Sequence, residues 1–215
     1  MMFDDIKEET TRDFLELRNW VLRIPDRTKD EDFFVISRGL FFVYAYGLYE
    51  KIIQKIVFQT ISMLNEAKIP ICECVYELYS LGFSKEYDGI ENVGREHKWE
   101  KRWGISEKLS SKFLLNIPSE TFPTDGKNIR YKQLESIAKT FGMRREVIPE
   151  NNLRGFLEEL VDNRNHIAHG DQTPKEVGRN YTKSDLLKRC NVISEICSYT
   201  IEIYEQYIID REYMR

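Results

Sequence analysis

The stretch Leu153-Arg-Gly-Phe-Leu-Glu-Glu-Leu-Val-Asp-Asn-Arg-Asn-His-Ile-Ala-His-Gly170 has the apolar spacing of a helix that packs in a helical core. Its apolar residues recur at three- and four-residue steps, and at about 100° per residue they form one stripe: Leu153, Phe156, Leu157, Leu160, Val161, Ile167 and Ala168. Arg164 falls near the middle of that stripe. An unpaired guanidinium there would cost several kcal/mol, so Arg164 must have a partner, reach water or serve a function.

The same helical period recurs along most of the chain and predicts an all-α fold. We expect helices over residues 4–24, 33–64, 72–81, 128–141 and 183–212, in addition to the motif helix. Together they predict an antiparallel helical bundle that forms one domain over residues 1–215. Residues 82–124 have a weaker pattern with several glycines and prolines, and we interpret them as a partly helical insertion.

Local signals refine two of these helices. Asn151 or Asn152 is expected to cap the start of the motif helix, and Gly170 is a typical residue at a helix C-terminus. Gly39 and Gly47 interrupt the long helix over 33–64 and would allow another helix to approach closely.

Composition limits the classes of function. The 32 basic and 36 acidic residues give a net charge of −4, which argues against a generally basic nucleic-acid binder. An anionic substrate would therefore need a local basic patch. The charged run from Arg95 to Arg102 could bind something acidic, although its alternating charges are also typical of a solvated helix face.

The cysteines and the N-terminus predict a reduced, cytoplasmic protein. Four cysteines in 215 residues do not form a small disulfide scaffold, and Cys72 and Cys74 lack CxxC spacing. Cys190 and Cys197 share a helix side and are expected to be core thiols. The N-terminus is too charged for a signal peptide, and the uncharged stretch over 39–49 is too short to cross a membrane, so no membrane partner is expected.

The segment Arg164-Asn-His-Ile-Ala-His169-Gly170, with the preceding stretch Asn128 to Gly142, resembles the HEPN superfamily of all-helical nucleotide-binding domains. Within it, the chain resembles the bacterial RiboL-PSP-HEPN-like group. The stronger part of the resemblance covers residues 128–171, and a weaker part covers the aromatic helix over 43–52. The resemblance implies a metal-independent endoribonuclease, often a toxin or a phage-defence effector, that dimerises so that two Arg-x4-His motifs face each other. Carried over residue by residue, it implies catalytic roles for Arg164 and His169, with Asn165 as the polar residue beside them.

These side chains suit metal-free cleavage of RNA. The reaction needs activation of the ribose 2′-OH, stabilisation of charge at phosphorus and protonation of the 5′-oxygen that leaves. Histidine can serve as base or acid near neutral pH, and arginine can hold phosphate oxygens. DNA lacks the 2′-OH, so the same groups would not suffice for it. No cofactor or metal is implied.

One helix does not bring the two catalytic candidates together. Arg164 and His169 are five residues apart and would point about 140° away from each other on an ideal helix. We therefore expect the helix to loosen near His169 and a homodimer to supply the second histidine. Asp162 shares the polar flank of Asn165 and His169, and Glu50 is a candidate partner that would position Arg164.

Two other interpretations stay open. In the first, Arg164 is structural, paired with a buried carboxylate such as Glu50, while His169 only caps helix carbonyls. In the second, Asp162, His166 and His169, at i, i+4 and i+7, hold a metal ion, although no fourth ligand is evident. Outside a metal site, His166 is expected on the surface or at the dimer interface.

The expected partners are RNA, a second copy of the chain and, if the protein is a toxin or a defence effector, an antitoxin or defence-system protein. Arg144, Arg145 and Arg154 are candidate RNA contacts and are equally interpretable as ordinary surface arginines. Some HEPN toxins carry a tyrosine two residues beyond the motif histidine, which a nucleotidyltransferase antitoxin modifies. Asp171 stands at that position, so control by that route is not expected. The alternative function is a catalytically inactive RNA- or nucleotide-binding or dimerisation module, which the net charge favours.

Overall fold

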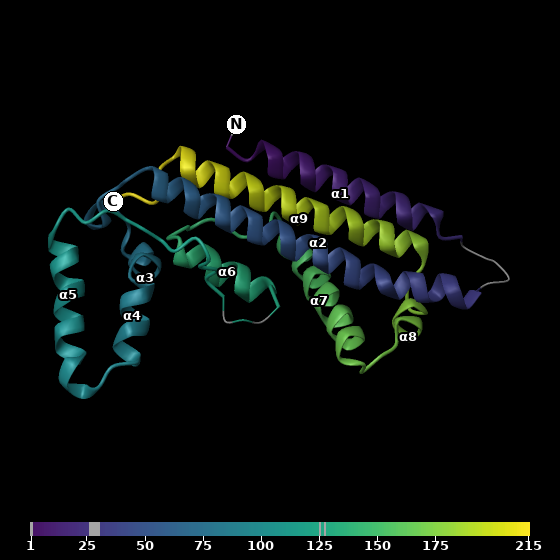
Figure 1. The fold of residues 1–215 in the computed structure, drawn as a ribbon. Coiled ribbons are helices and arrows are strands. Elements are labelled where there is room, and N and C mark those ends of the chain that lie inside the picture. Colours follow the sequence, from purple (N-terminus) through teal and green to yellow (C-terminus); the bar gives the residue numbers. More distant parts are fainter. Residues whose placement is uncertain (1, 26–30, 125, 127) are drawn as a thin grey trace.

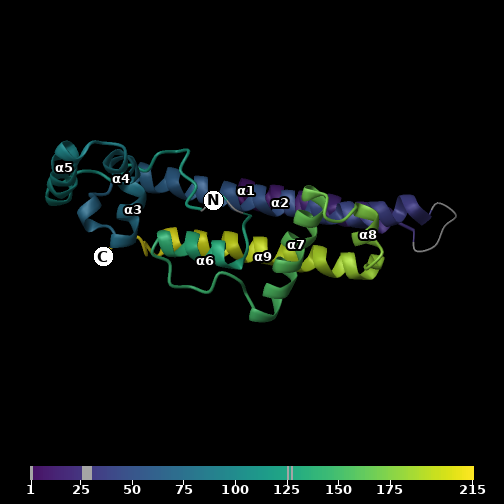
Figure 2. The same ribbon diagram turned by 90° about the horizontal axis from the view of Figure 1, so that it is seen from below.

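A computed structural model describes residues 2–25, 31–124, 126 and 128–215 of the chain. Its long axis is that of α2, Glu31–Glu66, whose 36 residues extend about 54 Å at 1.5 Å per residue. Two further helices, α1 (Asp4–Arg23) and α9 (Lys183–Ile209), lie along α2 (Figures 1 and 2). The described residues form helices and turns, with two isolated bridges and no strand, which confirms the all-α prediction.

Ion pairs between the three long helices fix their directions. Lys51 pairs with Asp13, and Lys7 at the start of α1 pairs with Glu205 near the end of α9. Helix α1 therefore runs antiparallel to both neighbours, whereas α2 and α9 run in the same direction (Figure 1). The core between them is apolar and aromatic, and Cys190 and Cys197 are buried in it as predicted.

A short helix, α8 (Pro174–Gly178), packs on the first half of α2 through two glycines. A Cβ atom at Gly39 would lie 1.9 Å from the Pro174 carbonyl oxygen, and one at Gly178 would lie 1.9 Å from the Val35 carbonyl oxygen. The predicted close approach at Gly39 is confirmed. The same prediction for Gly47 is wrong, because no atom of another described element lies within 4 Å of a Cβ atom built there.

Beyond the C-terminal end of α2 the chain forms an arm, residues 71–110, that projects from one end of the bundle (Figure 1). Its elements are the 3₁₀ turns Ile71–Glu73, Tyr76–Leu78 and Arg95–His97 and the helices α3 (Tyr79–Gly82), α4 (Ser84–Glu91) and α5 (Lys98–Ser110). Residues 82–124 are thus partly helical, as predicted.

The single helix expected over 72–81 is wrong, because the segment pairs with the end of the chain instead. The Val75 N–H donates to the Tyr213 carbonyl at 2.9 Å, and the Arg215 N–H donates to the Glu73 carbonyl at 2.9 Å. These bonds occupy backbone groups that a continuous helix would use internally.

The motif helix, α7 (Arg154–His169), crosses α2, and α6 (Tyr131–Thr140) lies between α7 and the arm (Figures 1 and 2). A 3₁₀ turn, Asn151–Leu153, precedes α7, so the expected asparagine cap is wrong: Leu153 occupies the N-cap position without a side-chain bond. Gly170, with φ +78°, ends α7 as predicted. None of the described helices has the length and apolar character needed to cross a membrane.

Candidate functional site

Arg164 is held by two amide oxygens at the point where α7 crosses α2. Its Nη1 donates to Oδ1 of Asn128 at 2.9 Å and to Oδ1 of Asn165 at 3.0 Å. Nδ2 of Asn128 donates to Oδ1 of Asn165 at 2.8 Å, which closes a triangle of hydrogen bonds. Among the described residues, the guanidinium donates hydrogen bonds only from Nη1, so Nε and Nη2 are available to a ligand. Both partners are uncharged amides, so among the described residues no ion pair offsets the positive charge of this partly buried guanidinium.

One face of the planar Arg164 guanidinium lies over an aromatic ring of α2. The guanidinium carbon of Arg164 lies 4.8 Å from the centre of the Tyr46 ring, which is buried. The Tyr46 hydroxyl donates to Oε1 of Glu50 at 3.0 Å and accepts from the Ile129 N–H at 3.1 Å. Burial raises the pKa of Tyr46 to about 12, so the ring stays neutral under Arg164 at ordinary pH. A cation above such a ring is stabilised by roughly 0.5–2 kcal/mol.

The direct pair expected between Arg164 and Glu50 is not among the contacts of the described residues. Glu50 instead accepts a hydrogen bond from the hydroxyl of Tyr46, the residue whose ring lies under Arg164. The reason is geometric. The Tyr46 ring fills the space on α2 next to the guanidinium, and Glu50 stands one helical turn further along α2.

His169 is the last residue of α7 and is exposed to solvent. The expected loosening of the helix near His169 is wrong, because α7 stays α-helical through that residue and ends at Gly170. Arg164 contacts Tyr46 of α2, whereas His169 is exposed at the C-terminal end of α7. No contact joins the two side chains among the described residues, in keeping with the separation of about 140° on an ideal helix.

The remaining polar residues of α7 are engaged in other contacts. Asp162 accepts a bond from Arg130 at 2.5 Å, and Arg130 also pairs with Glu158 at 2.8 Å, which joins the start of α6 to α7. His166 is exposed, and its Nδ1 lies 3.6 Å from Oδ2 of Asp171. The described residues contain no group of three or more His, Cys, Asp or Glu side chains placed to hold a metal ion, so Asp162, His166 and His169 do not form the alternative site.

The three arginines proposed to contact RNA have different surroundings. Arg144 is exposed, whereas Arg145 is paired with Asp210 and Glu212 at the end of the chain. The guanidinium carbon of Arg154 lies 4.3 Å from the centre of the Tyr131 ring. Arg144 and Arg154 thus keep charge that a ligand could use, and Arg145 already has two carboxylate partners.

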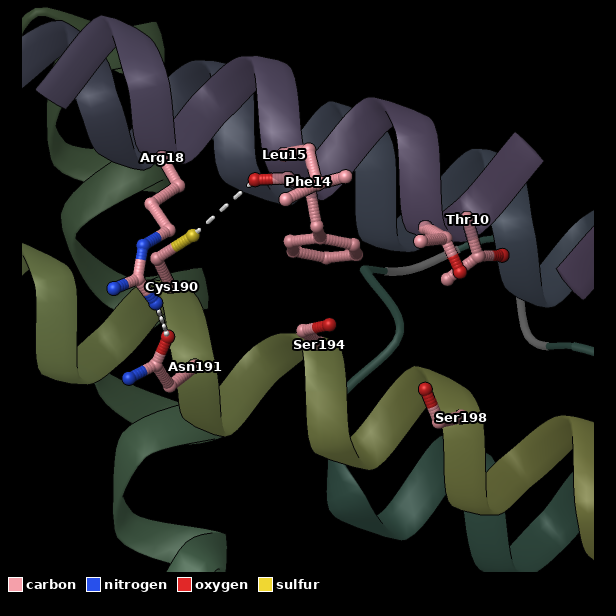
Figure 3. Close-up of a pocket in the computed structure, with 9 residues that line it drawn as sticks. Thr10, Phe14, Leu15, Arg18, Cys190, Asn191, Ser194 and Ser198 are labelled. Atoms are coloured by element: carbon pink, nitrogen blue, oxygen red, sulfur yellow. Dashed lines mark hydrogen bonds between the residues drawn. The ribbon is translucent and has the colours of Figure 1, made fainter. Parts of the chain in front are cut away.

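A separate hollow lies between α1 and α9, away from the contacts of Arg164 (Figure 3). It has a volume of about 180 Å³, and Arg18 donates to Oδ1 of Asn191 at 3.2 Å at one end of it. Its described lining contains no histidine and no carboxylate. The hollow therefore lacks the acid and base groups that the Arg164 region and the end of α7 supply.

Sequence reasoning missed Asn128 and Tyr46, the two residues that orient Arg164. Asn128 lies in the non-helical segment before α6, and Tyr46 lies on α2. Both fall inside the stretches that carry the family resemblance, and this was the available signal. Their contacts with Arg164 are long-range, so the helical period could not reveal them.

The family model RiboL-PSP-HEPN matches residues 8–206 of the chain. No match was found among curated proteins or among solved structures. The matched residues include α1 from residue 8, all of α2 and α7, and α9 up to residue 206, and so the contacts of Arg164 with Tyr46, Asn128 and Asn165. The chain belongs to the RiboL-PSP-HEPN family of the HEPN superfamily, and this membership supports a nuclease or an RNA-binding module as its general class of function.

Proposed function

We propose that the protein is a metal-independent endoribonuclease that cleaves RNA by attack of the ribose 2′-OH. The observation that carries the proposal is the state of Arg164. It is oriented by Asn128, Asn165 and Tyr46, has no carboxylate partner among the described residues, and keeps Nε and Nη2 available. An oriented, uncompensated guanidinium is suited to bind phosphate oxygens and to stabilise the charge that develops on them.

The proposed reaction transfers two protons. One histidine takes the proton of the 2′-OH, and the 2′-oxygen then bonds to phosphorus. The bond from phosphorus to the 5′-oxygen breaks, and a protonated histidine gives that oxygen a proton. The products are a 2′,3′-cyclic phosphate and a free 5′-OH. His169 is the candidate for one of these steps, and the copy of His169 in a second chain is the candidate for the other.

We further propose a homodimer, because His169 lies apart from Arg164 within one chain. An exposed apolar stripe on the first half of α2, made of Phe33, Ile36, Leu40, Val43 and Tyr44, is the surface we assign to self-association. It ends at Val43 and Tyr44, within one turn of Tyr46 along α2 but on a different side of the helix. We propose that a second copy covers this stripe and brings its own α7 to Arg164.

The test is cleavage of single-stranded RNA in EDTA, with the ends of the products mapped. The wild-type protein is expected to leave 2′,3′-cyclic phosphate ends, and Arg164→Ala and His169→Ala are each expected to abolish cleavage while their circular dichroism is unchanged. Cleavage that persists in both folded variants would overturn the assignment.

Mixed dimers test how the site is composed. Because the proposed reaction uses His169 of both chains, a mixed dimer of the wild type and His169→Ala proteins is expected to cleave no RNA. Mixed dimers that keep about half of the wild-type activity would mean that one His169 serves each site. Leu40→Glu, on the α2 stripe, is expected to give monomers in sedimentation experiments and to lose cleavage with them.

The second candidate function is a catalytically inactive RNA- or nucleotide-binding or dimerisation module. The separation of Arg164 from His169 and the net charge of −4 favour it. RNA binding without any cleavage product would support this candidate. A role as a cytoplasmic toxin or phage-defence effector, with an antitoxin or defence-system partner, is the biological setting we propose for the nuclease.

A further inference from the structure

Helix α5 of the arm presents two tryptophans to solvent. Trp99 and Trp103 are one turn apart, so they share a face, and each is 59% exposed. The opposite side of the helix carries Ile105, which packs into the core. Large aromatic residues are usually buried, and two of them exposed side by side indicate a surface that binds something.

The surroundings of these tryptophans are positively charged, although the whole chain is not. Residues 95–112 contain six lysines and arginines and three glutamates, in a chain with net charge −4. The guanidinium carbon of Arg102 lies 4.9 Å from the centre of the Trp99 ring. Two of the three glutamates, Glu96 and Glu100, lie against His97. Lys108 already pairs with Glu86, and the other basic side chains of residues 95–112 give α5 and its flanks the local positive charge that an anionic ligand requires.

We infer that α5 binds single-stranded RNA by stacking unpaired bases on Trp99 and Trp103, with Arg102 and the neighbouring lysines against the phosphates. This inference rests on the proposed function for the nature of the ligand. Bases of a single strand have free faces that can stack on indole rings, whereas bases in a duplex are already stacked on each other. Aromatic rings interleaved with basic side chains are the chemistry that recognises single strands without strong sequence preference.

The position of the arm suits a strand that continues to Arg164. The arm and α7 project from the same side of α2, with α6 between them (Figure 1). An open cleft of about 490 Å³ lies between the arm and α6, and its lining includes Tyr76, Tyr79, Tyr87 and Lys139. These rings offer further stacking surfaces on the way to α7.

The length of α2 sets a minimum size for such a substrate. About 20 residues of α2 separate Tyr46, under Arg164, from the end of the helix at Glu66, which is roughly 30 Å. A strand that touches both Arg164 and the arm must be long enough to cover that distance.

The binding experiment uses the full chain and a 2′-O-methyl oligonucleotide, which cannot be cleaved. Two of the three tryptophans in the chain are on α5, so stacking is expected to quench intrinsic fluorescence. Trp99→Ala with Trp103→Ala is expected to weaken binding of a 15-nucleotide uridine strand by about tenfold or more. The double change to tyrosine keeps aromatic rings and is expected to keep most of the affinity. Leu22→Ala, near the end of α1 and away from the arm, is the matched exposed control and is expected to bind like the wild type.

Strand length and ligand class complete the test. The alanine variant is expected to bind a five-nucleotide strand more weakly than the wild type does, because such a strand can stack on α5 without reaching Arg164. Equal affinity of wild type and alanine variant for the long strand, no binding of the long strand by the wild type, or fluorescence quenched by phosphatidylglycerol vesicles and not by RNA would each overturn the inference. Failure of cleavage with tryptophan-dependent binding intact would overturn the proposed nuclease alone.

Discussion

Oδ1 of Asn128 accepts a hydrogen bond from the Arg164 guanidinium at 2.9 Å, across the junction between the segment before α6 and the motif helix. The same asparagine donates to Asn165, so one side chain fixes both members of the Arg-Asn pair. Asn128 itself belongs to the non-helical segment before α6, in which the N–H of the next residue, Ile129, donates to the Tyr46 hydroxyl. The orientation of Arg164 thus depends on contacts between three separate parts of the chain.

Asn128→Ala is expected to free Arg164 without unfolding the protein. Loss of the hydrogen bonds should lower the free energy of unfolding by about 1–2 kcal/mol. A loosely held guanidinium should lower the rate of RNA cleavage by about a hundredfold, since misplacement of about 1 Å has effects of that size. Urea denaturation and single-turnover cleavage measure the two effects.

Asn163→Ala is the matched control for that variant. Asn163, like Asn128, is a partly buried asparagine, and it lies on α7. Its Nδ2 donates to the Tyr181 hydroxyl at 2.8 Å and to the Glu159 backbone carbonyl at 3.0 Å. Its loss should cost similar stability and leave cleavage close to that of the wild type. Equal loss of cleavage in both variants would mean that stability, and not the position of Arg164, limits activity.

Arg164→Met separates a catalytic role from a structural one. Methionine keeps a flexible apolar stem on the stripe of α7, and Asn128 and Asn165 keep their mutual bond. Replacing a partly buried charge by an apolar side chain of similar length should leave the free energy of unfolding within about 1 kcal/mol of the wild type. Cleavage should fall by about a hundredfold to a thousandfold, as when a donor to a charged transition state is removed. Thermal melting that drops steeply with this change would favour the structural interpretation of Arg164.

The helical period predicted the long elements well because their stripes are continuous. Residues 4–24 and 33–64 were expected to be helical, and α1 and α2 extend over Asp4–Arg23 and Glu31–Glu66. Arg164 also stood out, because it interrupts an otherwise apolar stripe. In these places local sequence and tertiary packing favour the same structure.

The helical period gave wrong predictions where residues distant in the sequence form hydrogen bonds with backbone groups that a helix would otherwise use. The helix expected from Asn128 begins only at Tyr131, because Ile129 gives its N–H to Tyr46 and Asn128 turns to Arg164. The segment over 72–81 fails for the same reason, since the end of the chain pairs with it. The candidate site is built from such long-range contacts, so its motif was visible in the sequence and its supporting residues were not.

Gly39→Ala tests the contact between α2 and α8. A Cβ atom there would lie 1.9 Å from the Pro174 carbonyl oxygen, so α8 must move away, and the free energy of unfolding should fall by at least about 2 kcal/mol. Gly47→Ala is the control on the same helix, because nothing lies within 4 Å of its new Cβ atom. That change should stabilise the protein by up to about 1 kcal/mol through helix propensity. Denaturant midpoints that move in the same direction for both variants would contradict the packing.

Alkaline pH is expected to destabilise the fold through its buried tyrosines. Burial raises the pKa of Tyr46 to about 12, against an ordinary value of about 10. A raised pKa means that the folded state favours the neutral hydroxyl, so the contribution of Tyr46 is complete below about pH 10 and is lost as the pH rises towards 12. Burial shifts the pKa of Tyr49, Tyr204 and Tyr207 in the same direction.

Urea denaturation of the wild type and of Tyr46→Phe at pH 9 and pH 11 isolates the contribution of Tyr46. The difference in unfolding free energy between the two proteins should narrow by about 1.3 kcal/mol over that interval, because phenylalanine has no proton to lose. Tyrosinate absorbance should rise together with the loss of helical circular dichroism, since the buried rings ionise when the chain opens. A difference that stays constant from pH 9 to pH 11 would mean that Tyr46 ionises at its ordinary pKa, and that its hydroxyl is not held by Glu50 and Ile129 in solution.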